Sequence, residues 1–353
     1  MPDRPVPDER LLRAPVERPV VRASLRFLVG IALGGGAVVA YLAVVGADDV
    51  LARVTAVAPL TIALVVTLVV AEGVADGLGV WASIRPLGDG LSGGRSVQFA
   101  LAGDFFDTVS PAGPVSSEPI LAQFVGVTTE TTYSEALGVR AVAKYLKSGT
   151  QLLVSTALVA VLVLGGPVPD TATSVVVVVV AAAAVFVVAG VVLVRSHEQV
   201  SPGLVAVLAP VLSRLPRLSR DRDEVKRAVD RFVSRALLFR SAPRLVALIA
   251  IGGLLEQLFS AAALYVALAG TGTPVGLLPL LALVPFPQAA TILPVPGSFG
   301  AYDGAMSGGL VLAASVPAAA ALAAVLVVRT ITFPFALVAG GIAVAFLRGW
   351  RPG

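Results

Sequence analysis

Long apolar runs, separated by short polar or proline-containing segments, extend over most of the 353-residue chain. The run at 174–194 contains no charged residue at all. Because a bilayer core about 30 Å thick needs about 20 apolar residues for one helical crossing, runs of this length are typical of transmembrane helices. The pattern therefore predicts an all-α polytopic membrane protein.

The apolar runs, divided at Gly, Pro and charged residues, predict about eight transmembrane helices. The expected crossings are 25–46, 57–83, 137–165, 174–195, 243–269, 274–293, 312–329 and 331–348.

Two further segments, 97–126 and 294–311, contain too many prolines and acids for a lipid-facing helix. Irregular backbone at membrane depth is tolerated only where protein or a water-filled cavity satisfies its amides. We therefore expect both segments to be re-entrant hairpins beside an internal cavity.

The composition agrees with a membrane protein, since 57% of the residues are hydrophobic and only 14% are charged. The net charge is +4, but the basic residues gather at helix ends and in one loop, so nucleic-acid binding is not expected. The chain has no Cys and one His, His197, which leaves no pattern for a metal or other cofactor site.

Basic residues assign the termini and the largest loop to the cytoplasmic side. Six Arg residues up to Arg26 stand before or at the start of the first expected crossing, and Asp48 and Asp49 follow it. Nine more basic residues lie in the loop 195–244, from Arg214 to Arg240. Cytoplasmic segments carry an excess of Lys and Arg, so we expect a multi-pass membrane protein with both termini in the cytoplasm. No organelle signal is seen, so the plasma membrane is the expected location.

The expected organisation is a cytoplasmic N-terminal tail at 1–24, a first membrane half at 25–195, a basic cytoplasmic loop at 196–242 and a second membrane half at 243–353. Within the loop, apolar residues recur at helical spacing at Val225, Ala228, Val229, Phe232 and Val233, which predicts an amphipathic helix on the inner leaflet. This helix could bind anionic lipids, or it could be a solvated linker that obeys topology alone.

The two expected hairpins share an order of residues. PAGPVSSE begins at Pro111 and reaches Glu118 seven residues later, and PGSFGAYD begins at Pro296 and reaches Asp303 at the same offset. The chain therefore reads as a two-fold internal repeat. Duplicated halves with paired broken segments are typical of secondary transporters, whose binding sites lie between the repeats. The hairpin motif residues are Pro111, Gly113, Pro119, Pro296, Gly297 and Gly300.

Acids inside the membrane are the candidate site residues. An ionised carboxylate at this depth usually faces a cavity, finds a partner or stays protonated. Glu118 and Asp303 could receive a lipid headgroup or a proton, or they could cap the broken helices beside them. Asp104 and Asp107, one helical turn apart, favour a solvated hairpin entrance over catalysis, because no nucleophile, metal ligand or His accompanies them.

Further acids lie within the expected crossings at Glu72, Asp76 and Glu256. They need counter-charges in lipid, and the candidates are Arg140, Lys144, Lys147 and Arg329. A salt-bridged network that orients the helices is the first interpretation, and a headgroup-binding or proton-coupling cluster is the second. Arg329 interrupts an apolar run, and its guanidinium suits a lipid phosphate as well as a carboxylate.

The stretches SPAGPVSSEP, VRAVAKYLKSG, LPVPGSFGAYDGA and VVRTITF together resemble the flippase-like membrane domain of lysylphosphatidylglycerol synthases and their stand-alone relatives. The chain departs from the family pattern at Ser116 and Ser117, where Gly-Gly is usual, and at Asp303, where Glu is usual. It departs further at 143–147, where Ala143, Lys144 and Lys147 stand in place of an acid-Arg pair and an Asp.

The resemblance implies an integral membrane protein that moves a phospholipid or lipid-linked headgroup between leaflets. Members that make lysyl-lipids carry an aminoacyl-transferase domain after the membrane part, whereas this sequence stops at Gly353, so no enzyme activity is expected. The expected partner is a membrane lipid, anionic or aminoacylated. The alternative is a scaffold or accessory subunit that docks a lipid-modifying enzyme. A transporter predicts a hydrated cavity that reaches both hairpin motifs, and a scaffold predicts a dry, internally paired core.

Overall fold

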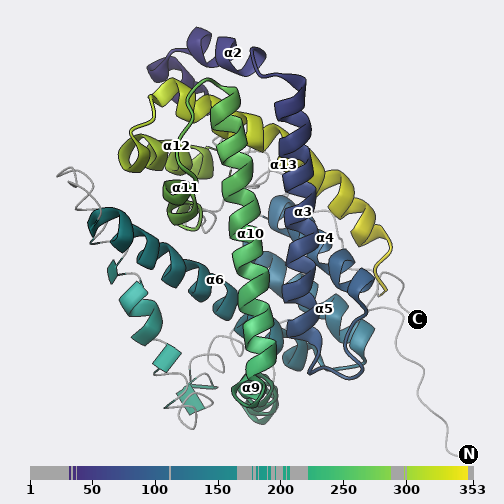
Figure 1. Ribbon diagram of the computed structural model, residues 1–353. Helices are drawn as coiled ribbons and strands as arrows, with labels where there is room; N and C mark the ends of the chain where they lie inside the picture. Colours follow the sequence, from purple (N-terminus) through teal and green to yellow (C-terminus); the bar gives the residue numbers. More distant parts are fainter. Residues whose placement is uncertain are drawn as a thin grey trace, which may run out of the picture.

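Two long helices, α3 (Pro59–Ile84) and α10 (Pro243–Gly270), pack side by side at the centre of the computed structural model (Figure 1). Each begins with a proline in its first turn, where the missing N–H costs no helical hydrogen bond. The structure describes residues 38–110, 113–164, 222–287, 298 and 300–348, together with isolated positions between 32 and 36 and between 177 and 206. All regular secondary structure in this part of the chain is helical.

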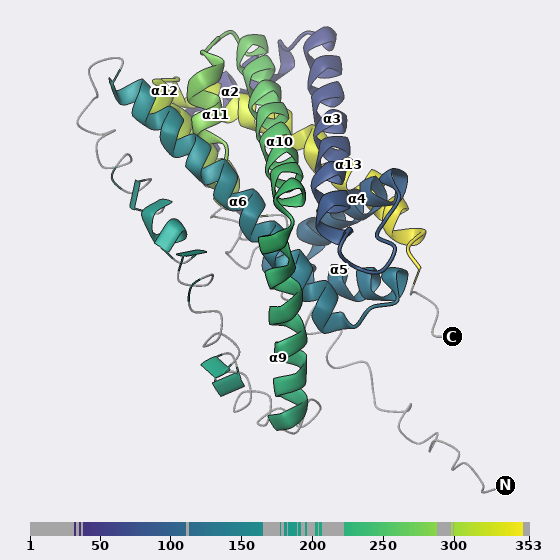
Figure 2. The ribbon, with the colours of Figure 1, turned by 60° about the horizontal axis from the view of Figure 1, so that its bottom comes forward.

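The remaining helices lie beside and behind this pair in the view of Figure 1, and Figure 2 shows the same arrangement turned so that its bottom comes forward. They are α2 (Ala47–Thr55), α4 (Gly93–Val109), α5 (Gly113–Thr129), α6 (Tyr133–Leu164), α9 (Arg222–Leu237), α11 (Leu277–Leu283), α12 (Ala301–Ala314) and α13 (Ala318–Ala345), with a 3₁₀ turn at Leu238–Ser241. The order of a long helix, two shorter helices and a long helix occurs twice, as α3 to α6 and as α10 to α13.

The central helices run antiparallel. Thr61, near the start of α3, lies against Gly270 at the end of α10, and Gly79, near the end of α3, lies against Gly252. A Cβ atom on Gly252 would stand 2.8 Å from the backbone nitrogen of Gly79, so only glycine permits this approach. Small residues at such crossings let helix backbones pack closely inside a membrane.

Two apolar cores lie toward opposite ends of this pair. One consists mainly of α4, α5 and α6 side chains with one end of α3, and Phe99, Leu121 and Val139 are fully buried in it. The other consists of α10, α11, α12 and α13 side chains with the opposite end of α3, and it buries Leu280 and Leu310. The long helix of each half also packs on a short helix of the other half, α6 on α11 and α13 on α4.

Four helices of the described part, α3, α6, α10 and α13, are long and apolar enough to cross a membrane. Large apolar side chains are exposed along them, and the exposed fraction is 71% at Leu60, 88% at Leu164 and 63% at Val338. Such a surface would be unstable in water but suits contact with acyl chains. The chain is therefore a membrane protein, as the apolar runs predict.

The expected crossings at 57–83, 137–165 and 243–269 correspond to α3, α6 and α10. The two expected at 312–329 and 331–348 are wrong as separate crossings, because α13 is one helix of 28 residues with Pro334 inside it. The charge of Arg329 suggested a helix end, but a buried partner, described below, compensates this charge within the helix. The count of eight is not confirmed, and the expected crossings at 25–46 and 174–195 lie largely outside the described residues.

The remaining expected elements differ in detail. The described part of 274–293 contains only the short helix α11. The segment 97–126 is helical rather than irregular, since α4 and α5 have 17 residues each and meet around Ser110. Gly113 begins α5 and Pro119 lies within it, while Pro111, Pro296 and Gly297 lie outside the described residues. The re-entrant placement of these segments stays a prediction.

The amphipathic helix of the basic loop is confirmed as α9. Its apolar side is buried at Val225 and Val229, and its backbone at Phe232 rests on Gly138 of α6. In Figure 1, α9 is seen almost end-on at the foot of α10, so the two helices point in different directions. This arrangement is compatible with α9 lying along the membrane surface while α10 crosses the bilayer.

The close approach of α3 and α10 makes Gly252 sensitive to substitution. We expect Gly252→Ala to destabilise the protein by roughly 1–3 kcal/mol, because its Cβ would overlap the backbone of Gly79. Gly308→Ala is the matched control, since a Cβ there meets nothing within 4 Å. Thermal unfolding in detergent compares the two variants, and equal melting temperatures would contradict this packing.

Candidate functional site

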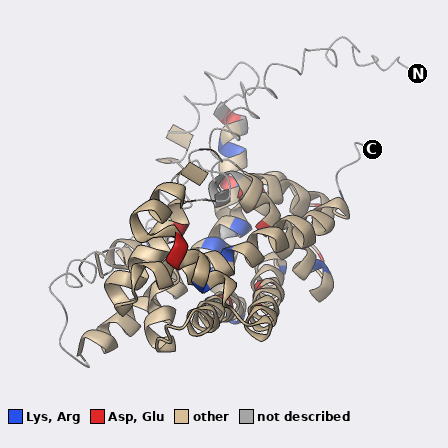
Figure 3. Cartoon of the chain, turned by 90° about the horizontal axis from the view of Figure 1, so that it is seen from above, with Lys and Arg blue, Asp and Glu red and all other residues tan. Residues whose placement is uncertain are grey.

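Helical positions occupied by charged residues gather in the middle of the bundle, as the blue and red segments show in the view from above (Figure 3). They come from both halves of the chain and lie between the two apolar cores. The residues concerned are Glu72, Asp76, Asp104, Asp107, Glu118, Arg140, Lys144, Lys147, Glu256, Asp303 and Arg329. Ion pairs inside a membrane protein need close geometry to offset desolvation, so the individual contacts decide what this group can do.

Glu118 of α5 and Arg140 of α6 form a two-pronged ion pair. The Arg140 Nε and Nη2 atoms donate to the two carboxylate oxygens at 3.0 and 2.8 Å. Arg140 is almost fully buried, and the Glu118 side chain is 15% exposed. Glu118 thus has an ion-pair partner on the next helix. A bidentate Arg–carboxylate contact fixes the orientation of both groups and joins the hairpin to the long helix that follows it.

Lys144 lies one helical turn beyond Arg140 and faces two acids. Its Nζ atom is 3.7 Å from Asp107 and 3.7 Å from Glu118. Ser117 donates a hydrogen bond to Asp107 across the α4–α5 junction. The Lys144 side chain keeps 36% of its surface exposed, which makes it the most accessible cation of this group.

Lys147, on the same face of α6, reaches the crossing of α3 and α10. Its Nζ atom lies 2.5 Å from Asp76 of α3 and also forms an ion pair with Glu256 of α10. Nearby, Gln151 of α6 donates to the backbone oxygen of Gly253 at 2.8 Å. One cation thus holds together two long helices from different halves of the chain.

Asp303 and Arg329 form the corresponding pair of the second half. Arg329 Nε lies 3.0 Å from Asp303 Oδ1, and the Asp303 side chain is only 3% exposed. The other oxygen, Oδ2, accepts the backbone N–H of Gly300 at 2.9 Å, so Asp303 is both a helix cap and an ion-pair partner. Gly300 has a φ of 74°, which favours glycine at this cap. The Arg329 guanidinium also lies 5.2 Å from the ring centre of Tyr302.

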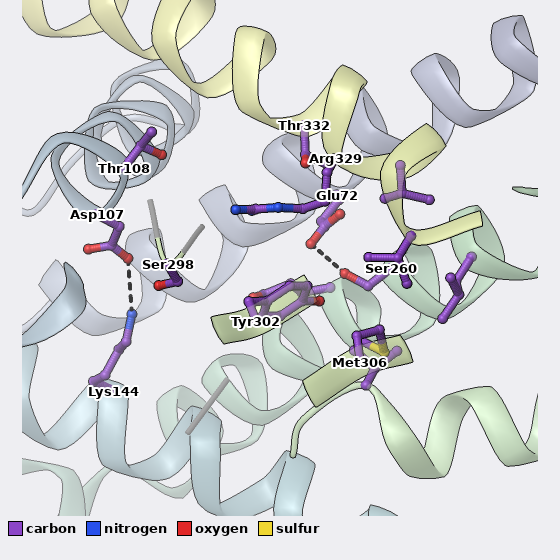
Figure 4. A pocket seen from close by; sticks show the side chains of 15 residues that line it. Glu72, Asp107, Thr108, Lys144, Ser260, Ser298, Tyr302, Met306, Arg329 and Thr332 are labelled. Atoms are coloured by element: carbon purple, nitrogen blue, oxygen red, sulfur yellow. Dashed lines mark hydrogen bonds and ion pairs between the residues drawn. The ribbon is translucent and has the colours of Figure 1, made fainter. Parts of the chain in front are cut away.

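These groups line a polar cavity in three chambers that share walls. The largest, about 280 Å³, contains Lys144 and Asp107 on one side and Arg329, Tyr302 and Glu72 on the other (Figure 4). A second chamber of about 200 Å³ shares Glu72, Asp107 and Arg329 with the first. The third, about 80 Å³, reaches Glu118 and Arg140.

The cavity therefore extends between the motifs of both halves. Its walls come from α3, α4, α5 and α6 of the first half and from α10, α12 and α13 of the second. Within the described ranges, no three His, Cys, Asp or Glu side chains are placed to hold a metal ion.

The structure brings together the eleven charged candidates from the sequence. Ten line the cavity: Glu72, Asp76, Asp104, Asp107, Glu118, Arg140, Lys144, Lys147, Glu256 and Arg329. The eleventh, Asp303, is the partner of Arg329. Neither Glu118 nor Asp303 faces lipid. A lipid-facing position for these two acids would have contradicted the cavity. Of the hairpin motif residues, Gly300 caps α12, and Gly113 and Pro119 belong to α5.

Two further residues shape the cavity. Tyr302 lies beneath Arg329 in the largest chamber (Figure 4). Glu72, for which a helix-orienting network was the first interpretation and a headgroup-binding or proton-coupling cluster the second, opens onto two chambers and accepts a hydrogen bond from Ser260 at 2.6 Å. The sequence contains a pattern that relates Glu72 to Glu256. Glu72 lies 13 residues after Pro59, and Glu256 lies 13 residues after Pro243.

The comparison with protein families completes this description. Residues 27–340 match the family described as "Lysylphosphatidylglycerol synthase TM region". The chain belongs to this family. The match includes both halves and every charged residue of the cavity. The comparison with curated proteins gave no match.

Removal of the cation at the helix crossing tests how the site is held together. We expect Lys147→Met to destabilise the protein by about 3–5 kcal/mol, because it leaves two buried acids without their counter-charge. The triple variant Lys147→Met, Asp76→Asn, Glu256→Gln should regain most of this loss. Thermal unfolding in detergent provides the comparison.

The control is Asp49→Asn, which breaks an exposed ion pair with Arg53 and should cost about 0–1 kcal/mol. A Lys147→Met variant as stable as Asp49→Asn would mean that the crossing does not depend on this cation.

Proposed function

We propose that the protein moves a membrane phospholipid or lipid-linked headgroup between leaflets through the charged cavity. The observation that carries this proposal is the position of the cavity, which lies between the two similar halves and reaches the ion pair of each. Membership of a family named for the membrane region of a lipid synthase supports a lipid as the partner. In this proposal the polar headgroup passes through the cavity while the acyl chains stay in the bilayer.

The charges of the cavity suit a phospholipid headgroup. Arg329 and Lys144 both line the largest chamber, and a lipid phosphate could accept hydrogen bonds from either cation. Each cation already pairs with an acid, Arg329 with Asp303 and Lys144 with Asp107 and Glu118. A phosphate would therefore compete with a carboxylate for a cation held in position, which permits both binding and release.

The arrangement of helices suggests how access alternates. Helices α3 and α10 run antiparallel and begin equivalent halves, as expected for an inverted repeat with its symmetry axis in the membrane plane. We propose that α4–α5 and the segment leading into α12 are re-entrant elements of the two halves. Rocking of one half against the other would then open the cavity to each leaflet in turn.

The scaffold interpretation predicts a dry core, and the polar cavity favours translocation instead. In our proposal the protein changes the position of the lipid and not its covalent structure, so it is not an enzyme. The basic residues of α9 and of the N-terminal segment support the expected orientation in the plasma membrane, with both termini in the cytoplasm. An enzyme that supplies the modified lipid would be a natural partner.

Leaflet exchange in proteoliposomes tests this function. Purified protein is reconstituted with fluorescently labelled phosphatidylglycerol or its lysylated form, and exchange is measured as loss of fluorescence to an external quencher. We expect Glu118→Gln and Asp303→Asn each to slow exchange by about 10- to 100-fold, since a charged hydrogen bond contributes about 1.5–3 kcal/mol. Asp49→Asn, at an exposed pair, should exchange at the normal rate.

A charge-swapped variant separates a transport role from a structural one. Glu118→Arg combined with Arg140→Glu can restore the pair and the fold, but it reverses the field at the third chamber. We expect this variant to fold and to remain slow. Normal exchange in the swapped variant would reduce the pair to a structural contact, and no exchange above empty vesicles for either lipid would contradict the proposed function.

A further inference from the structure

Glu72 and Glu256 occupy the same position in α3 and α10 but have different partners. Each lies 13 residues after the proline that begins its helix, and both line the largest chamber. Glu256 forms an ion pair with Lys147. Glu72 instead accepts a hydrogen bond from the neutral hydroxyl of Ser260, and it forms no ion pair within the described residues. Two equivalent carboxyl groups are thus in different chemical environments.

The charge balance of the cavity leaves Glu72 without a positively charged partner. Six acids and four bases line the three chambers. Each base has an acidic partner already: Lys147 pairs with Asp76 and Glu256, Lys144 with Asp107 and Glu118, Arg140 with Glu118, and Arg329 with Asp303. The two acids outside these pairs are Glu72 and Asp104.

An ionised carboxylate inside a membrane costs several kcal/mol unless a counter-charge compensates it. A bound proton removes this cost without further ligands, whereas a metal cation needs several oxygen atoms around it. The one described hydrogen-bond partner of the Glu72 carboxyl group is Ser260. The surroundings of Glu72 therefore favour a proton.

We propose that Glu72 carries a proton in this conformation and that its release and uptake accompany headgroup movement, so that lipid transport responds to a proton gradient. This inference rests on the proposed function. It adds an energy source that neither the family nor the motifs assign.

The groups that face Glu72 determine when the proton leaves. Its charged and titratable neighbours across the two larger chambers are Asp76 on α3, Asp104 and Asp107 on α4, Lys144 on α6, Glu256 on α10, Tyr302 on α12 and Arg329 on α13, and Lys147 of the third chamber contacts Asp76 and Glu256. A basic side chain that approaches Glu72 would favour release of the Glu72 proton. A phosphate that draws Arg329 or Lys144 away from its acid would favour proton uptake by that acid.

The equivalence of the two halves suggests the other conformation. In an inverted repeat, the halves exchange arrangements when access switches from one side to the other. The Glu72 position would then acquire a charged partner, as Glu256 has now, and Glu72 would release its proton to the side that the cavity then faces. Glu72 would take up a proton from the opposite side when the first arrangement returns, so one proton crosses the membrane in each cycle and the gradient sets the direction of movement.

Infrared spectroscopy tests proton binding without any transport assay. The purified protein should show carbonyl absorption from protonated carboxylic acids at neutral pH, and Glu72→Gln should lower its intensity by the share of one carboxyl group. Glu130→Gln, at an exposed position outside the cavity, should leave the intensity unchanged. Glu72→Asp retains a carboxyl group and should keep the intensity, which guards against loss through misfolding. Unchanged absorption in Glu72→Gln would overturn the assignment.

Leaflet exchange of labelled phosphatidylglycerol under an imposed pH gradient tests the coupling. The wild-type protein and Glu130→Gln should move the lipid several-fold faster in one direction than in the other, and Glu72→Gln should lose this asymmetry. The same rates with choline in place of sodium would exclude a sodium gradient.

Exchange that occurs but ignores the pH gradient would refute the coupling and leave the proposed function intact. Exchange that responds to a sodium gradient but not to the pH gradient would also refute the proton coupling. Failure of all exchange would contradict the proposed function instead, and the infrared measurement would still decide whether Glu72 holds a proton.

Discussion

The central constraint on this fold is that charges inside a membrane must be compensated where they lie. Lys147 meets this constraint at the crossing of α3, α6 and α10 by pairing with Asp76 and Glu256. The pairing fixes the distance and rotation of three long helices that otherwise present mostly apolar surfaces. Because lipid is as apolar as a leucine-rich helix face, apolar contact alone would specify this arrangement weakly.

The same constraint connects structure with function. The charged cavity lies between two apolar cores, one formed mainly by the first half and the other mainly by the second. The Glu118–Arg140 and Asp303–Arg329 pairs tie each shorter helix to the long helix after it, within one half. The ion pairs that hold the helices together also supply the cations that a phosphate would bind and the carboxyl groups that a proton would bind.

The sequence alone was sufficient for the all-helical membrane class and for three long helices, since uninterrupted apolar runs determine them. It failed where a charge was misread, because Arg329 suggested the end of a helix and in fact lies inside α13. Pairing could not be predicted, since Lys147 and Asp76 are 71 residues apart and only the packing brings them together. The role of Glu72 depended on recognising that α3 and α10 are equivalent and antiparallel.

Cysteine accessibility tests most directly the claim that a hydrated cavity lies inside the membrane-embedded bundle. The natural chain contains no Cys, so single substitutions report one position each. Thr108→Cys faces the cavity, and Val338→Cys lies on the apolar outer surface of α13. In vesicles, a water-soluble, membrane-impermeant thiol reagent should label Thr108→Cys and leave Val338→Cys unlabelled. Labelling of Val338→Cys with protection of Thr108→Cys would contradict the account.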